Sequence, residues 1–189
     1  MANKDSAFGL RPIGKVGQNK DNQGLSEYSI AASATAIYQG DPVEMLATGT
    51  IGVAAAGDVL LGSLNGVFFT DATTSKPTFA NHLNASNTAT DIKGFVTDDP
   101  YQRYEVQSNN TGASAQTDIG NVANIEYAAG SSPNYVSKVE LDDSDLATSD
   151  GQLKVIGVSR DPDNNDLSSA NVNFVVTINE HFLKQEAGI

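Results

Sequence analysis

The sequence contains no cysteine and no tryptophan, and its two histidines, His82 and His181, lie far apart. Without cysteine, no disulfide can staple the fold and no thiol can act as a nucleophile. Neither histidine has a partner at the spacing typical of zinc sites. No apolar run approaches the roughly 20 residues of a membrane-spanning helix, and the first residues lack a signal peptide's apolar core. We therefore expect that the protein has no membrane partner and that it is made in a cytoplasm.

Basic residues are also scarce. The chain has 11 Lys and Arg against 23 Asp and Glu, which gives a formal net charge of -12. A surface with this balance repels phosphate groups, so we expect no nucleic-acid partner. The basic residues gather at the front, where Lys4, Arg11, Lys15 and Lys20 face only Asp5 within residues 1–20. This separation suggests either a solvated tail or a basic arm that docks on an acidic surface, and the arm's sequence favours docking.

Residues 1–24 are predicted to form an extended N-terminal arm. Apolar residues alternate with small or polar ones, and glycines and Pro12 disfavour helix throughout this stretch. Its apolar positions are Phe8, Leu10, Ile13 and Val16. Such an arm has too little apolar surface to fold alone, so it can lie on its own body or on a neighbouring subunit.

Residues 25–189 are predicted to form an all-β body, either a compact β-barrel or a sandwich. Short stretches of β-forming residues recur at regular intervals, and Gly, Asp, Pro and Asn separate them. A clear example is the run from Tyr101 to Ser108, in which Gln102, Tyr104 and Val106 share one face. Long polar loops interrupt the body at 71–92 and 109–117, and the first of these resembles an inserted loop with room for a short strand.

The sequence offers few groups for catalysis or metal binding. It has no nucleophile elbow and no phosphate-binding loop. The run Asp161-Pro162-Asp163-Asn164-Asn165-Asp166 imitates part of a calcium loop, but the glycine and distant glutamate of an EF-hand are missing, so an Asp/Asn-rich turn is the preferred interpretation. We assign no catalytic residue, no cofactor and no metal ligand, and we predict that the chain is not an enzyme.

Three stretches resemble small virion proteins. From Ala36 to Phe69 the order is a strand, Gly-Asp-Pro-Val, a second strand, a Gly-Asp turn and Gly-Val-Phe. This resembles the capsid-decoration (cement) proteins of tailed phages, in which a compact β-barrel repeats such turns. The opening residues 7–17 and the ending residues 173–182 resemble small virion proteins of marine phages. The resemblance covers about half of the chain, and the polar insertion at 71–92 departs from it.

The resemblance implies a cement protein, made in the host cytoplasm, that binds the major capsid protein on the outer surface of a phage head. In this interpretation the arm adds a strand to an exposed sheet edge of a shell subunit. Phe8, Leu10 and Ile13 would be its anchors, Arg11 and Lys15 would meet acidic shell residues, and Pro12 would limit the freedom of the unbound arm. The resemblance also implies a homotrimer over a local three-fold axis.

Three alternatives remain open at this point. The chain could be another virion component from a neck, tail or head fibre, which would occur in fewer copies. It could be a carbohydrate-active enzyme that uses a pair of carboxylates in a deep pocket. It could also be an adhesin-like module stabilised by calcium at residues 161–166, in which case calcium would raise its melting temperature.

Overall fold

The computed structural model describes residues 2–17, 24–109 and 114–185. Within these residues the chain is mainly antiparallel β-structure, its only helical elements are short 3-10 turns, and it holds no α-helix. The predicted all-β class is therefore confirmed. In the part of the chain that is described, no helix has the length and apolar character required to cross a membrane.

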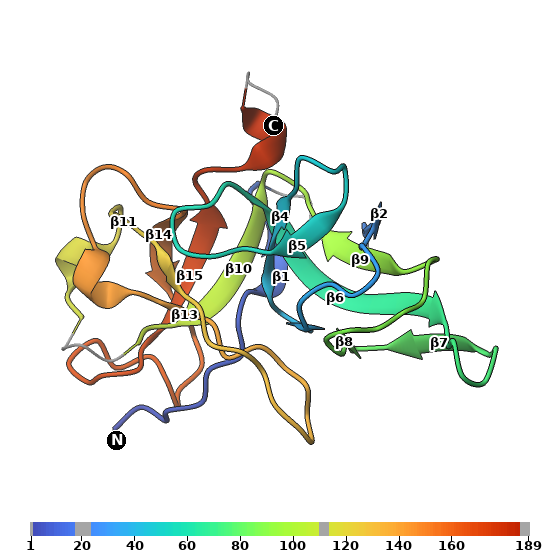
Figure 1. The fold of residues 1–189 in the computed structure, drawn as a ribbon. Coiled ribbons are helices and arrows are strands. Elements are labelled where there is room, and N and C mark those ends of the chain that lie inside the picture. The colour runs from blue at the N-terminus through green and yellow to red at the C-terminus, as the bar shows by residue number, and fades with distance from the viewer. Residues whose placement is uncertain (1, 18–23, 110–113, 186–189) are drawn as a thin grey trace.

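The first large sheet joins the N-terminal segment to the C-terminal half of the chain (Figure 1). Its strands, in spatial order, are β1 (Arg11–Lys15), β10 (Gln102–Gln107), β15 (Asn173–Ile178), β14 (Leu153–Val158) and β11 (Val122–Ala123). Tyr104, Val106, Phe174 and Val176 from its central strands are fully buried and form the centre of one hydrophobic core.

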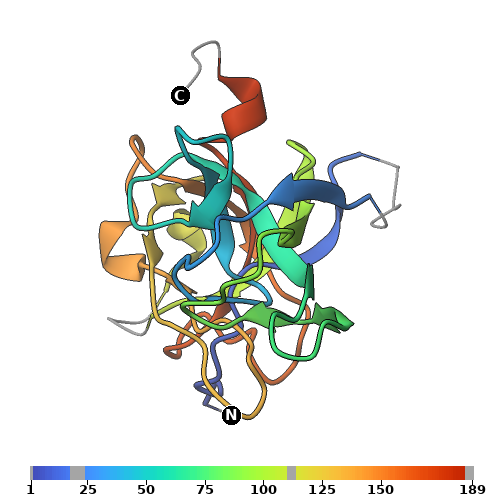
Figure 2. The same ribbon diagram turned by 45° about the vertical axis from the view of Figure 1, so that its right-hand side comes forward.

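The second large sheet comes from the first half of the chain and has its own core. Its strands are β2 (Ser26–Ser29), β9 (Lys93–Thr97), β6 (Leu60–Thr70), β4 (Pro42–Met45) and β5 (Ile51–Val53), with β7 (Pro77–Ala80) also paired to β6. Val43, Ile51, Leu64 and Val96 lie at the centre of this second core. Figure 2 turns this sheet toward the viewer.

Smaller elements complete the fold. Two short ladders pair β3 (Ile37–Tyr38) with β8 (His82–Leu83) and β12 (Ile125–Glu126) with β13 (Glu140–Leu141). The 3-10 turns are η1 (Gln116–Asp118), η2 (Asp143–Asp145) and η3 (Phe182–Lys184). Both large sheets end in two different edge strands in the described residues, so neither closes into a barrel, and the arrangement is consistent with a sandwich.

The turn between β3 and β4 shows why local sequence predicted much of this fold. Gly40 has a φ of 88°, a backbone conformation that suits glycine, and Pro42 follows as the first residue of β4. The carboxylate of Asp41 accepts a hydrogen bond from the backbone N–H of Tyr38 at 2.8 Å. Asp41 is nevertheless fully buried, which the sequence did not predict.

The region 71–92 is more ordered than a simple inserted loop. It contains β7 and β8, and β7 pairs with the end of β6 from Val67 to Thr70. The second predicted loop, 109–117, includes residues 110–113, which lie outside the described residues.

Part of the predicted arm belongs to the first sheet of the body. Residues 11–15 form β1, an integral strand of the first sheet, with Arg11 opposite Glu105 and Lys15 opposite Gln102. The predicted extended conformation is present, but its partner is the chain's own β10. Lys20 and the end of the predicted arm lie outside the described residues.

Candidate docking surface of the N-terminal segment

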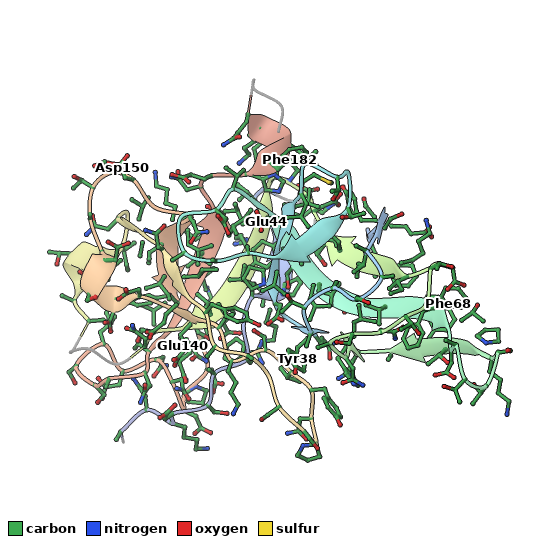
Figure 3. All side chains as sticks on the ribbon, viewed as in Figure 1. Tyr38, Glu44, Phe68, Glu140, Asp150 and Phe182 are labelled. Atoms are coloured by element: carbon green, nitrogen blue, oxygen red, sulfur yellow. The ribbon has the colours of Figure 1, made fainter. Side chains whose placement is uncertain are left out.

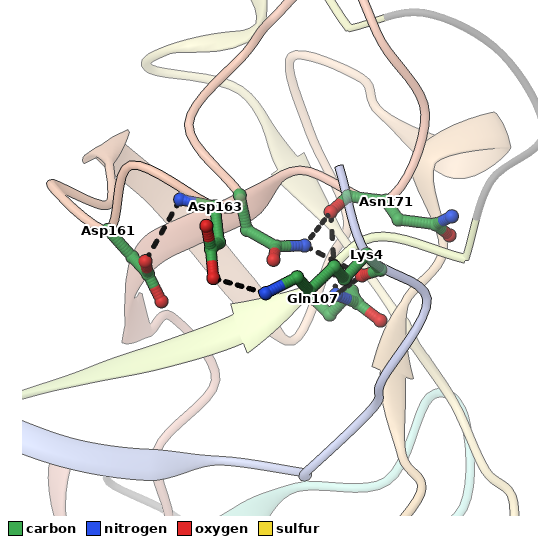
Figure 4. A network of polar contacts seen from close by, with 6 residues as sticks. Lys4, Gln107, Asp161, Asp163 and Asn171 are labelled. Atoms are coloured by element: carbon green, nitrogen blue, oxygen red, sulfur yellow. Dashed lines mark hydrogen bonds and ion pairs between the residues drawn. The ribbon is translucent and has the colours of Figure 1, made fainter. Parts of the chain in front are cut away.

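The first residues of the chain are fixed to the C-terminal half by polar contacts (Figure 4). Lys4 forms an ion pair with Asp163. The backbone carbonyl of Lys4 accepts hydrogen bonds from Gln107 Nε2 at 2.9 Å and from Asn164 Nδ2 at 2.8 Å. Asn164 also donates to the carbonyl of Asn171 at 2.8 Å. Residues far apart in the sequence therefore hold the start of the chain in place.

Leu10 lies at the point where the two sheets meet. Its side chain is fully buried in the core of the first sheet. Its backbone N–H donates to the carbonyl of Gly40 at 2.8 Å, and its carbonyl accepts from Ser63 Oγ at 2.6 Å, so its main chain is bonded to elements of the second sheet. The Leu10 side chain is thus covered by the chain's own residues in this conformation, and its role as an anchor for a partner subunit stays a prediction.

Gly9 permits this close approach of the segment to the body. Its φ is 73°, and a Cβ atom built on it would lie 2.3 Å from the carbonyl oxygen of Gly40 and 2.5 Å from Ser137 Cβ. Both distances are far shorter than van der Waals contact. A side chain at position 9 would push the segment away from the β3–β4 turn.

The cations of the segment face carboxylates of the same chain. The guanidinium of Arg11 pairs with buried Glu105 and lies over the Phe8 ring, 4.4 Å from its centroid. Lys15 Nζ lies 2.8 Å from Asp99 Oδ2, and this lysine holds the pKa of Asp99 below its usual value. The charge complementarity expected between a basic arm and an acidic shell is thus realised within the molecule, although the Arg11 side chain remains half exposed.

Four of the six predicted partner-binding residues line one groove. Phe8, Leu10, Arg11 and Pro12 belong to the lining of a cavity of about 290 Å³. Gln39, Asn65 and Val136 also line it. The groove combines an aromatic ring, a half-exposed cation and two amides, so it can receive an apolar side chain with a hydrogen-bonding or acidic group nearby. Ile13 and Lys15 are not among its lining residues.

Next to the groove, β1 presents an exposed strand edge. Ile13 is 41% exposed and Val16 is 53% exposed. In the described residues β1 pairs with β10 alone, and its register shifts between Pro12 and Gly14. Proline is common on edge strands because it has no backbone N–H to donate to a ladder. Bulges in the register are also frequent at sheet edges. The surface formed by the groove, Ile13 and Val16 is called the β1 surface below.

A second apolar surface was not predicted. Phe68, Phe79 and Phe95 lie on β6, β7 and β9, and Phe79 is 74% exposed. The ring centroids of Phe68 and Phe79 are 4.8 Å apart, and those of Phe79 and Phe95 are 6.2 Å apart. Figure 3 places Phe68 at the outer part of the second sheet. The run Val67-Phe68-Phe69 is apolar throughout, so the sequence gives no sign that Phe68 points outward between buried Val67 and Phe69.

Both histidines have packing roles. The His82 ring stacks on Tyr135 with centroids 3.8 Å apart and an interplanar angle of 4°, and burial lowers its pKa. Buried His181 accepts a hydrogen bond from the backbone N–H of Leu183 at its Nδ1. Burial, with a smaller effect from Lys184, lowers the pKa of His181 to about 4. Both rings are therefore neutral at pH 7.

The acidic run 161–166 forms a turn whose carboxylates are bound by the protein itself. Asp161 accepts from the N–H of Asp163, and Asp166 accepts from the N–H and hydroxyl of Ser168. The ion pair with Lys4 occupies Asp163. No group of three or more potential metal ligands is present among the described residues. The preferred interpretation as a turn agrees with this geometry.

Comparisons with known proteins add no relative. No family model, no curated protein and no solved structure matches this chain.

Proposed function

We propose that this chain is a decoration protein of a tailed-phage head, which binds the outer surface of the major capsid protein and stabilises contacts between its subunits. The proposal rests on the sequence resemblance and on the β1 surface. It assigns the chain a structural role without a catalysed reaction, a place on the capsid surface, and assembly as a homotrimer.

The observation that carries the proposal is the grouping of Phe8, Arg11 and Pro12 in one groove beside exposed Ile13. Protein interfaces are enriched in aromatic residues and arginine, and a few such residues supply most of the binding free energy. A groove next to an open strand edge can accept both a side chain and a main-chain strand from a partner. The Arg11 guanidinium lies over the Phe8 ring, and a contact of this kind that persists before binding lowers the entropic cost of association.

The charge distribution is compatible with a lattice protein. The net charge of -12 gives decorated particles surfaces of the same sign, which opposes their aggregation. Within a trimer, one bound subunit raises the effective concentration of the other two at the shell, so several weak contacts together give firm attachment. A modest affinity at each β1 surface is therefore sufficient.

A binding assay with preformed shells tests the proposal. The purified protein is mixed with shells of the major capsid protein encoded in the same genome, and co-sedimentation is measured. We expect saturable binding that Ile13→Asp weakens at least about tenfold, because a desolvated carboxylate at an interface centre costs more than 1.4 kcal/mol. Ile156→Asp is the matched control, since Ile156 is similarly exposed at 38% but lies on β14, separated from β1 by β10 and β15.

Four results would contradict parts of the proposal. Absence of binding to the shells would overturn the decoration role. Equal binding by the Ile13→Asp and Ile156→Asp variants would remove the β1 surface from it. A low copy number of the chain in purified virions would favour a neck, tail or fibre component instead, and a monomeric mass in solution would remove the trimer.

A further inference from the structure

A larger groove lies on the second sheet, away from the β1 surface. It has a volume of about 560 Å³, and its lining includes Leu46 and Val53 as partly exposed apolar residues. Side-chain oxygen atoms in the lining come from Glu44, Ser33, Thr35 and Tyr127, and Glu44 is its one carboxylate. Figure 3 labels Glu44 on β4. No residue is shared between the linings of the two grooves.

Glu44 lacks a cation in this groove. In the described residues its carboxylate forms no ion pair, and the charge that acts on it is the negative charge of Asp58. Burial, followed by the repulsion from Asp58, raises the pKa of Glu44. A partly buried carboxylate without a positive partner is unfavourable, and a cation placed beside it would recover that free energy.

Room for a cation beside Glu44 comes from the groove itself. Gly52 on β5 lies directly opposite Glu44 in the β4–β5 ladder, and the Leu46 side chain covers Gly52, with Leu46 Cδ1 3.1 Å from the place that a Cβ of Gly52 would take. Ala31, Ala32 and Ala34 form another part of the lining with small side chains. The groove thus places apolar side chains beside a single carboxylate, which matches an aliphatic stem that ends in a compact cation.

We propose that the Glu44 groove receives a lysine side chain from a neighbouring protein subunit. The stem of the lysine packs against Leu46 and Val53, and its ammonium group binds the Glu44 carboxylate. Charge complementarity favours this occupant over a purely apolar one, because an apolar side chain would bury the carboxylate further without a partner. This inference goes beyond the decoration role and uses different residues, so either can fail without the other.

Titration of the isotopically labelled full chain with a capped lysine tests the inference. N-acetyl-lysine methylamide is added at millimolar concentration at pH 7, and amide shifts of Gly52, Ala32 and Ala54 are followed by nuclear magnetic resonance. We expect saturable shifts at these residues. The matched compound N-acetyl-norleucine methylamide has the same stem without the charge and should bind at least about tenfold more weakly.

Variants separate the role of Glu44 from a general charge effect. Glu44→Gln keeps the shape of the side chain and should weaken lysine binding about tenfold or more. Glu27→Gln removes an exposed carboxylate on β2 and should leave it unchanged. Three outcomes would each overturn the proposal. Equal binding of the lysine and norleucine compounds would assign the groove to an apolar occupant. The other two outcomes are lysine binding retained in Glu44→Gln and the absence of any saturable shift.

Discussion

The backbone N–H of Leu10 donates a hydrogen bond to the carbonyl of Gly40 at 2.8 Å, while the Leu10 side chain is buried in the core of the other sheet. One residue of the N-terminal segment thus contacts both halves of the molecule. The segment that the sequence suggested for binding a neighbour also joins the two sheets of its own chain. Any partner must therefore bind the outer side of this segment, where Arg11, Ile13 and Val16 remain accessible.

Truncation of Leu10 should destabilise the whole fold. Leu10→Ala removes a fully buried side chain, and such changes cost about 2–5 kcal/mol because a cavity adds to the lost burial. Urea denaturation measures the change in the free energy of unfolding. Val16→Ala, at an exposed position, should change it by less than about 0.5 kcal/mol. Equal effects would show that Leu10 is not part of a tightly packed core.

Deletion of residues 1–20 should unfold or strongly destabilise the body, contrary to the behaviour of a free arm. The deletion removes Leu10 and the whole of β1, and it exposes the edge of β10 together with unpaired Glu105. Circular dichroism and thermal melting of the truncated chain would measure this. A truncated chain with an unchanged melting temperature would restore the interpretation of an independent arm.

Gly9→Ala should lower stability more than Gly17→Ala. Both glycines have positive φ, at 73° and 94°, so both substitutions carry the backbone cost of about 1–2 kcal/mol for an L-residue. The collision with Gly40 and Ser137 is present at position 9, whereas a Cβ at position 17 has no atom within 4 Å. The difference in melting temperature between the two variants therefore isolates the contact between the segment and the body. Similar temperatures would mean that the segment can shift at little cost.

The buried carboxylate of Asp41 should make stability fall as the pH rises from about 4 to about 6. Burial raises the pKa of Asp41 from 3.8 to about 6, so in this interval the folded state binds more protons than the unfolded state. Glu140 acts in the same direction, because burial and then Asp5 raise its pKa to about 7. Asp41→Asn should remove a part of this decline on the order of 2 kcal/mol, measured by denaturation at several pH values. An unchanged slope in the variant would contradict the buried position of this charge.

His181 should produce the opposite dependence. Its pKa in the folded state is lowered to about 4 from 6.5, so the unfolded state binds more protons between these values and stability falls as the pH drops from 6.5 toward 4. His181→Gln should reduce this loss, because a neutral amide does not gain a charge on unfolding. His82→Gln is the matched control. Burial also lowers the pKa of His82, but His82 is more exposed than His181. If both variants behave alike, the desolvation of His181 is not the cause.

Local sequence predicted most of the strands, because alternation and turn chemistry act over a few residues. In the run 102–107, Gln102, Tyr104 and Val106 were predicted to share a face, and all three are buried. The β3–β4 turn followed from Gly40 and Pro42. The outward face formed by Phe68, Phe79 and Phe95 was missed, since it depends on the pairing of β6 with both β7 and β9.

The sequence by itself determined an all-β chain with an extended, apolar and basic first segment. Only the tertiary structure decided where that segment lies, because a strand with this alternation can pair with any open edge of suitable register. The choice of β10 depends on Glu105 facing Arg11, on the absence of a side chain at Gly9 and on the space for Leu10 between the sheets. These three conditions join residues that are distant in the sequence, 94 positions apart for Arg11 and Glu105, and a pattern that acts over neighbouring residues cannot encode them.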